Sequence, residues 1–147
     1  MITNKILVNT IKCYILISFI SLFYVSIMGI FSPQQVMELV RVSLTNTDAI
    51  SSIRGVYGGV GFTISCLLLF LFFKKPEWAH GFLILFWGSY ALSRILTILM
   101  DGKLGDFGAN WLLIESLLCV IGLFLLIIKN ILTKSDEMIY LMVDQGK

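Results

Sequence analysis

The sequence predicts an all-α fold: an integral membrane four-helix bundle with a short amphipathic surface helix between helices 1 and 2. Hydrophobic residues make up 58% of the 147 residues and charged residues only 14%, whereas a soluble domain usually carries about 25% charged residues. The apolar residues fall into four long runs, each close to the roughly 20 residues that cross the hydrocarbon core. Four spans and their loops use the whole length, so we expect residues 1–147 to form a single transmembrane domain.

Each apolar run ends at charged or helix-breaking residues. The expected spans cover residues 11–31, 53–73, 78–100 and 110–131. Span 2 stops at Lys74-Lys75-Pro76, and span 3 stops at Asp101-Gly102. Lys5 and Lys12 precede the first run, as in a signal peptide, but the run is too long and lacks a small-x-small cleavage site. We therefore expect an uncleaved anchor.

The long connection between the first two spans contains the expected surface helix. The pair Ser32-Pro33 is typical of a helix start, and apolar residues recur at helical spacing from Val36 to Leu44. Such a helix is expected to lie on the outer surface. The tail, residues 132–147, is expected in the cytoplasm, where its short apolar run from Met138 to Val143 would rest on the inner surface.

The loop charges predict the orientation of the chain. Seven lysines lie in the N-terminal segment, the loop between spans 2 and 3, and the tail: Lys5, Lys12, Lys74, Lys75, Lys129, Lys134 and Lys147. The opposite loops carry only Arg41 and Lys103, plus Arg54 at a helix start. Because cytoplasmic loops are enriched in Lys and Arg, we expect a multi-pass membrane protein with both termini cytoplasmic.

Three charged residues lie inside otherwise apolar spans: Arg54, Arg94 and Glu115. A charge in the bilayer costs at least a few kcal/mol, so such residues usually pair or serve a function. At 1.5 Å per residue, Arg94 lies about 9 Å below the outer end of span 3 and Glu115 about 7–8 Å below the outer end of span 4. Arg54 opens span 2 at the same face, so we expect all three near one depth.

Helical spacing adds further residues to these charges. The predicted ligand-binding or structural polar cluster consists of Arg54, Tyr57, Tyr90, Arg94, Asp101 and Glu115. Four glycines are predicted to pack helices closely: Gly55, Gly58, Gly59 and Gly61. The Gly55-x-x-x-Gly59 spacing is typical of close helix approach in membranes. The alternative is that these glycines leave a hollow for a ligand beside Arg54 and Tyr57.

The charged cluster allows three interpretations. In the structural one, Arg94 pairs with Glu115 to fix the register of spans 3 and 4, while Arg54 extends to the headgroups. In the functional one, a pocket open to the outer leaflet binds an anionic or polar headgroup beside the arginines. The third is a proton relay through Glu115. Four-span multidrug exporters carry an acid in their first span, and span 1 here contains none.

The remaining reactive residues indicate no metal site and no cofactor. Cys13, Cys66 and Cys119 lie far apart without a Cys-x-x-Cys, which favours small core residues over redox or metal chemistry. The single His80, near Glu77, is expected at the wet end of a helix. No nucleophile has an evident base, so an enzyme is disfavoured. A net charge of +2 is too small to indicate nucleic acid.

Four short segments carry a resemblance to a known family: Ser52–Gly59, Ser93–Leu96, Asp101-Gly102 and Ile114-Glu115. With these segments, the sequence resembles the DUF4345 proteins, small bacterial four-span membrane proteins of unknown function. The resemblance covers residues 11–128 and includes the Phe31-Ser32-Pro33 junction. It implies a four-helix bundle in the inner membrane and supplies no activity. A fainter likeness to DoxX-type and sterol-scaffold-type membrane proteins rests on architecture alone, which does not define function.

These observations predict a small multi-pass membrane protein, non-enzymatic, that binds a lipid-like or amphipathic ligand or a partner protein through an outer-leaflet polar cluster. A membrane lipid is the expected partner, with a homo-oligomer or a membrane protein as alternatives. Two other functions stay open. One is a membrane enzyme that acts on a lipid or isoprenoid with Glu115 as acid or base. The other is a small oligomeric transporter or subunit.

Overall fold

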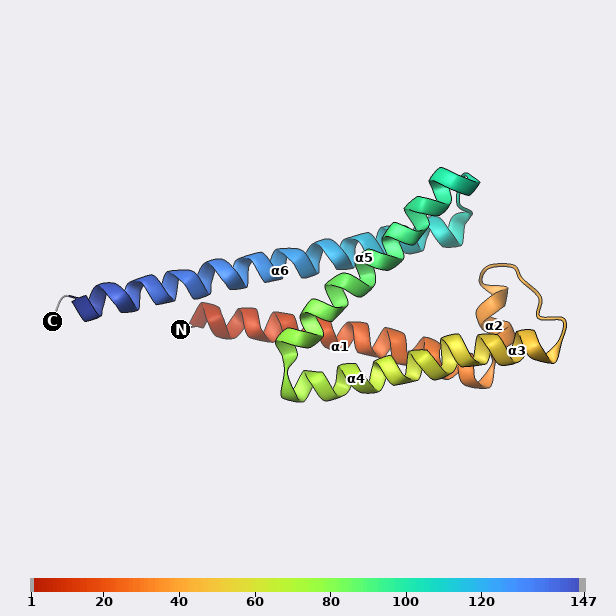
Figure 1. Ribbon diagram of the computed structural model, residues 1–147, viewed down its shortest axis with the longest axis horizontal. Helices are drawn as coiled ribbons and strands as arrows, with labels where there is room; N and C mark the ends of the chain where they lie inside the picture. The colour runs from red at the N-terminus through yellow and green to blue at the C-terminus, as the bar shows by residue number, and fades with distance from the viewer. Residues whose placement is uncertain (1, 146–147) are drawn as a thin grey trace.

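The computed structural model describes residues 2–145, and every regular element in that range is helical (Figure 1). The elements are α1 (Ile2–Phe31), α2 (Pro33–Glu38), α3 (Thr47–Ile53), the π-helix η1 (Arg54–Val60), α4 (Gly61–Lys74), α5 (Pro76–Asp101) and α6 (Asp106–Gln145). Four stretches are long and apolar enough to cross a membrane: Lys5–Phe31, Thr47–Lys74, Pro76–Asp101 and Asp106–Ser135. The all-α fold with four long apolar helices is thus confirmed, and the chain is a multi-pass membrane protein.

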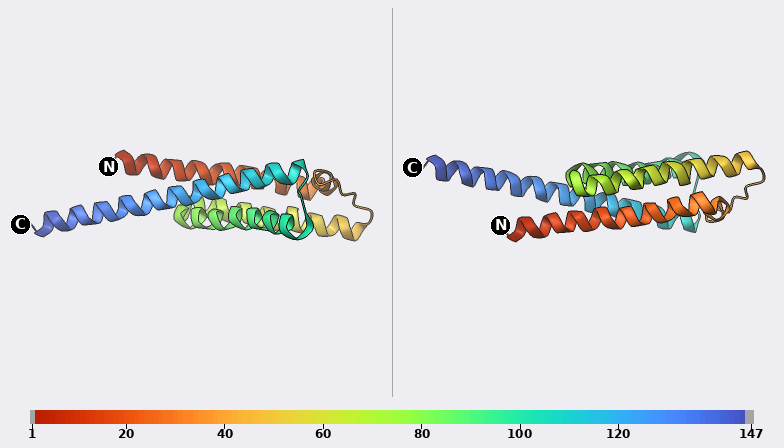
Figure 2. Two further views of the ribbon diagram at one scale, coloured as in Figure 1. Left: turned by 90° about the horizontal axis from the view of Figure 1, so that it is seen from above. Right: turned by 90° about the horizontal axis from the view of Figure 1, so that it is seen from below.

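The long helices run up and down between two ends of the molecule. Both termini and the turn from α4 to α5 lie toward one end, while α2 and the α5–α6 loop lie at the opposite end, here named the distal end (Figures 1 and 2). The segments α3, η1 and α4 follow one another without a break as a single long helix. In Figure 1, α5 diverges from this helix as it approaches the distal end. The distal end is therefore the more open end of the bundle.

Two helix pairs form the bundle, and α1 lies against both. Helix α5 packs mainly on α6, while η1 and α4 pack mainly on α1. Ile15, Leu68 and Leu83 are fully buried where α1, α4 and α5 meet, and Trp87 is almost completely buried beside them. This core follows the expected pattern, because each helix contributes one apolar face to it.

Polar side chains inside this core form hydrogen bonds between helices. The Tyr14 hydroxyl donates to the Leu118 carbonyl at 3.2 Å, and the Trp87 indole N–H donates to the Ser18 hydroxyl at 3.2 Å. The hydrocarbon offers no water to satisfy such groups, so these bonds connect α1 to α5 and α6.

The expectation that His80 lies at the wet end of a helix is wrong. Its side chain is only 1% exposed, and Nε2 lies 3.0 Å from the Gly122 carbonyl oxygen of α6. The ring also packs edge-on against Tyr14. His80 is only one turn from the start of α5, but it lies on the face that contacts α1 and α6.

Glycines allow α1 and η1 to cross at very short distance. A Cβ placed on Gly29 would lie 2.7 Å from the Gly58 nitrogen, and one on Gly58 would lie 2.9 Å from the Ile30 nitrogen. Gly61 also faces α1, where a Cβ would lie 3.1 Å from the Ser26 Cβ. Larger residues would push the two backbones apart at this crossing.

For contacts within one chain, the predicted packing role is wrong for Gly55 and Gly59. A Cβ on either residue would meet nothing within 4 Å. The prediction assumed α-helical spacing, but residues 54–60 form a π-helix. Its i→i+5 hydrogen bonds change the number of residues per turn. The close contact therefore falls on Gly58 and Gly61 instead of the Gly55-x-x-x-Gly59 pair.

Candidate functional site

Two of the three charged residues meet in a bidentate ion pair between α5 and α6. Arg94 Nε donates to Glu115 Oε2 at 2.6 Å, and Arg94 Nη2 donates to Oε1 at 2.9 Å. The Glu115 side chain is 2% exposed and that of Arg94 is 20% exposed. This parallel geometry is the strongest form of an Arg–carboxylate contact. Both carboxylate oxygens are thus occupied, while the guanidinium keeps an accessible edge.

Arg54 does not join this pair. Its Nε donates to the Ile30 carbonyl oxygen at 2.9 Å, and the side chain is exposed. The last four carbonyl groups of a helix lack intrahelical partners, and Ile30 lies at the C-terminal end of α1. Arg54 therefore caps α1, and it lies apart from Arg94 and Glu115 because η1 packs mainly on α1.

The other predicted cluster residues divide in the same way. Tyr90 precedes Arg94 by about one turn on α5, and both Tyr90 and Tyr57 are partly exposed. Asp101 is exposed as the last residue of α5. Among the side chains that the structure describes, it makes no ion pair. The structure thus joins two of the six predicted residues, Arg94 and Glu115, directly and leaves Arg54 and Asp101 outside this pair.

A cavity of about 460 Å³ opens beside the ion pair at the distal end. We name it the distal pocket, and its lining residues are Leu39, Val40, Arg41, Arg94, Leu104, Gly105, Asp106, Phe107 and Gly108. They come from the turn after α2, from α5, from the α5–α6 loop and from the first turn of α6. The volume lies within the range of about 300–1,000 Å³ that is usual for ligand sites. Arg94 lines the pocket, whereas Glu115 does not.

Arg41 occupies a backbone conformation that favours glycine. Its φ is 59°, and its N–H donates to the Glu38 carbonyl at 2.9 Å while the Val42 N–H donates to the Met37 carbonyl at 3.0 Å. These two bonds form a Schellman motif after α2, in which glycine normally takes the left-handed position. A larger residue there costs about 1–2 kcal/mol. Non-glycine residues in such strained conformations cluster at functional sites, and Arg41 lines the distal pocket.

The sequence did not indicate Arg41, Asp106 or Phe107 as site residues. Arg41 falls in the expected connection between spans 1 and 2, and the other two fall between the expected spans 78–100 and 110–131. The pocket forms only because the chain after α2 lies against the α5–α6 loop. The one sequence signal was that Arg41 is a rare cation among the loops on its side of the membrane.

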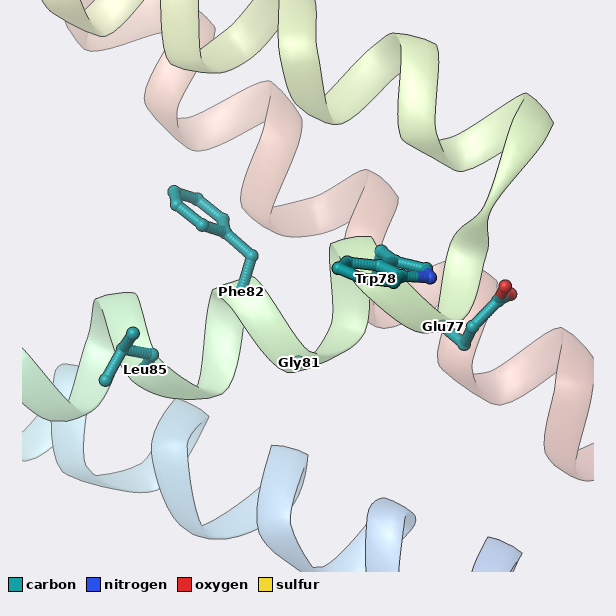
Figure 3. Close-up of a pocket in the computed structure, with 5 residues that line it drawn as sticks. All are labelled: Glu77, Trp78, Gly81, Phe82 and Leu85. Carbon is teal, nitrogen blue, oxygen red and sulfur yellow. The ribbon is translucent and has the colours of Figure 1, made fainter.

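A second cavity, of about 480 Å³, lies near the opposite end of α5 (Figure 3). Its lining residues all belong to that one helix: Glu77, Trp78, Gly81, Phe82 and Leu85. Figure 3 shows Glu77 and Trp78 at the start of the helix, with Gly81, Phe82 and Leu85 further along it. A binding site normally combines an apolar wall with several converging polar groups. The lining of this groove lacks such a set of converging polar groups.

The chemistry of the described side chains is limited. Within residues 5–135, no group of three or more His, Cys, Asp or Glu residues could hold a metal ion. The three cysteines are free and distributed over separate helices. The distal pocket instead offers arginine N–H groups, one carboxylate and apolar walls, which suit an amphipathic ligand.

A family model described as "Domain of unknown function (DUF4345)" matches residues 10–126, well over half of the chain. The chain belongs to this family. In this DUF4345 protein the ion pair, the glycine crossing and all residues that line the distal pocket fall within the matched region. The helix beyond residue 126 lies outside it. Searches among curated proteins and among solved structures gave no match.

Proposed function

We propose that this DUF4345 protein binds a lipid-like, amphipathic ligand in the distal pocket. The headgroup would lie beside Arg41 and Arg94, and the apolar part would contact Leu39, Val40, Leu104 and Phe107. The observation that carries this proposal is the cavity of about 460 Å³ in which two arginines share a wall with these apolar side chains.

The ion pair prepares Arg94 for such a role. A guanidinium has five N–H donors, and the bonds from Nε and Nη2 to Glu115 use two of them. Because Glu115 is buried and Arg94 is partly exposed, the remaining donors can reach a ligand. Glu115 then fixes the orientation of the guanidinium without entering the pocket, which lowers the entropy lost on binding.

Membrane position supports a lipid as the ligand. The pocket lies where α5 ends and α6 begins, at the boundary of two membrane-spanning stretches. A headgroup at that level would keep its acyl chains in the hydrocarbon. Both termini lie at the other end of the bundle (Figure 1), and the lysine distribution favours a cytoplasmic location for that end. The pocket would then face the outer leaflet of a cytoplasmic membrane.

The same geometry disfavours the enzymatic alternative. A general base must reach the proton that it removes, whereas Glu115 is buried and both of its oxygens accept bonds from Arg94. Acid or base chemistry on a lipid would first require this bidentate pair to break. The binding function requires no such step.

Arg41→Gly provides a test that leaves the fold intact. Glycine suits φ 59° better than arginine, so we expect unchanged or slightly higher thermal stability. Loss of one charge-assisted hydrogen bond should lower lipid affinity by roughly ten- to a hundredfold. The measurement is native mass spectrometry of the detergent-solubilised protein with added phospholipid.

The matched control for this test is Lys103→Gln. It also removes one exposed cation from the distal end, but Lys103 does not line the pocket. We expect this variant to bind lipid like the wild type. Equal lipid binding by Arg41→Gly and the wild type would refute the proposed function.

A further inference from the structure

The distal pocket contains charges of both signs. Its charged lining residues are Arg41, Arg94 and Asp106. The charge of Arg94 is balanced by Glu115, with which it forms two hydrogen bonds. Among the side chains that the structure describes, this is the single ion pair. One positive charge on Arg41 and one negative charge on Asp106 therefore remain without an ionic partner in the described part of the chain.

Asp106 contributes a carboxyl group to the pocket wall. It lies in the first turn of α6, where the helix dipole favours a negative side chain. The residue is exposed, and glycines flank the segment at Gly105 and Gly108. An ionised carboxylate only accepts hydrogen bonds. A ligand group beside Asp106 should therefore be a donor, and a cation would suit it best.

The arginines require the opposite chemistry. The planar guanidinium matches the geometry of phosphate oxygens, which accept two parallel N–H bonds. Arg41 supplies a whole guanidinium, and Arg94 supplies the donors that Glu115 leaves free. A phosphate beside the arginines and an ammonium beside Asp106 would satisfy all three charged residues of the pocket.

We infer that the distal pocket selects the zwitterionic phosphoethanolamine headgroup of a membrane lipid over an anionic headgroup. This inference rests on the proposed lipid binding and adds its selectivity. An anionic lipid such as phosphatidylglycerol offers a phosphate to the arginines but no cation to Asp106. The Asp106 carboxylate would then repel the bound lipid's charge. The apolar walls favour a lipid over a water-soluble zwitterion, because they gain contact only with acyl chains.

A competition between two lipids tests the inference. The probes are palmitoyl-oleoyl phosphatidylethanolamine and palmitoyl-oleoyl phosphatidylglycerol, added in equal amounts and quantified by native mass spectrometry. We expect wild type to prefer the ethanolamine lipid by about two- to fivefold, the effect of one exposed ion pair. Asp106→Asn should abolish this preference while it preserves binding of the glycerol lipid.

Asp48→Asn is the matched control. Asp48 is also an exposed aspartate in the first turn of a helix, α3, but it does not line the pocket. This variant should keep the full preference for the ethanolamine lipid. Loss of the preference in both variants would show a general surface-charge effect and overturn the inference.

A third probe separates a lipid headgroup from a soluble ligand. Glycerophosphoethanolamine has the same headgroup without acyl chains, and at equal concentration it should not displace the lipid. Displacement would overturn the lipid as the source.

The two proposals fail in distinguishable ways. Equal or stronger binding of the glycerol lipid by wild type, still weakened by Arg41→Gly, would overturn the selectivity and leave lipid binding intact. Binding of neither lipid would overturn both proposals.

Discussion

Replacing Glu115 with glutamine should lower the stability of the detergent-solubilised protein by about 2–4 kcal/mol. The Glu115 side chain is only 2% exposed. The substitution therefore leaves the positive Arg94 guanidinium beside a buried, neutral amide. Glutamine keeps the shape of the side chain, so the loss of stability measures the contribution of the charge and of one hydrogen bond. The measurement is a thermal or chemical unfolding curve followed by circular dichroism.

Two further variants show whether the pair itself is responsible. The exchange Arg94→Glu with Glu115→Arg should restore much of the stability, because it forms the same pair with reversed direction. Glu77→Gln, which removes an exposed glutamate from the start of α5, should change stability by no more than about 0.5 kcal/mol. A Glu115→Gln protein as stable as the wild type would contradict the role of the ion pair in joining α5 and α6.

Replacing Gly58 with alanine should destabilise the bundle by about 1–3 kcal/mol, as overpacking usually does. The added Cβ would lie 2.9 Å from the Ile30 nitrogen and 3.1 Å from the Gly29 carbonyl carbon. Both are backbone atoms, so α1 and η1 would have to move apart. The same unfolding curve measures this effect.

Gly59→Ala is the matched control, since Gly59 is the next residue of η1 and a Cβ there meets nothing within 4 Å. We expect it to be neutral or slightly stabilising, as Gly-to-Ala changes in helices usually are. A larger loss at Gly59 than at Gly58 would contradict the described crossing. It would instead indicate that the Gly55 and Gly59 face is covered by a second copy of the chain.

Helical spacing and depth were sufficient to predict part of the site. Arg94 and Glu115 lie on adjacent antiparallel helices at similar distances from one short loop, so their depth follows from counting residues. The strong cost of an unpaired charge in lipid then favours their contact. This reasoning identified the pair as the structural alternative, and the structure forms it.

The same reasoning could not predict the position of Arg54. Its depth was close to that of the other two charges, but depth says nothing of the order of helices around the bundle. Arg54 lies on the helix that packs on α1, and the free Ile30 carbonyl is its partner. Its partner was a backbone group, which a search for complementary charges does not consider.

The distal pocket could not be predicted from the sequence for a different reason. It depends on the left-handed turn at Arg41, and local sequence gives no reason to expect such a turn without glycine or asparagine. It also depends on how the chain after α2 lies against the α5–α6 loop. Both are tertiary features. The π-helix at residues 54–60 is a similar case, and only Gly58 and Gly61 of the four predicted glycines face α1.

The proposed function depends most on whether a lipid occupies the distal pocket. A crystal structure of the protein grown from a lipid phase that contains phosphatidylethanolamine tests this most directly. We predict density for a headgroup within hydrogen-bond distance of the Arg41 and Arg94 guanidinium groups, with its acyl chains beside Leu104 and Phe107. Ordered lipids elsewhere on the helices, together with a pocket that holds only water, would contradict the account.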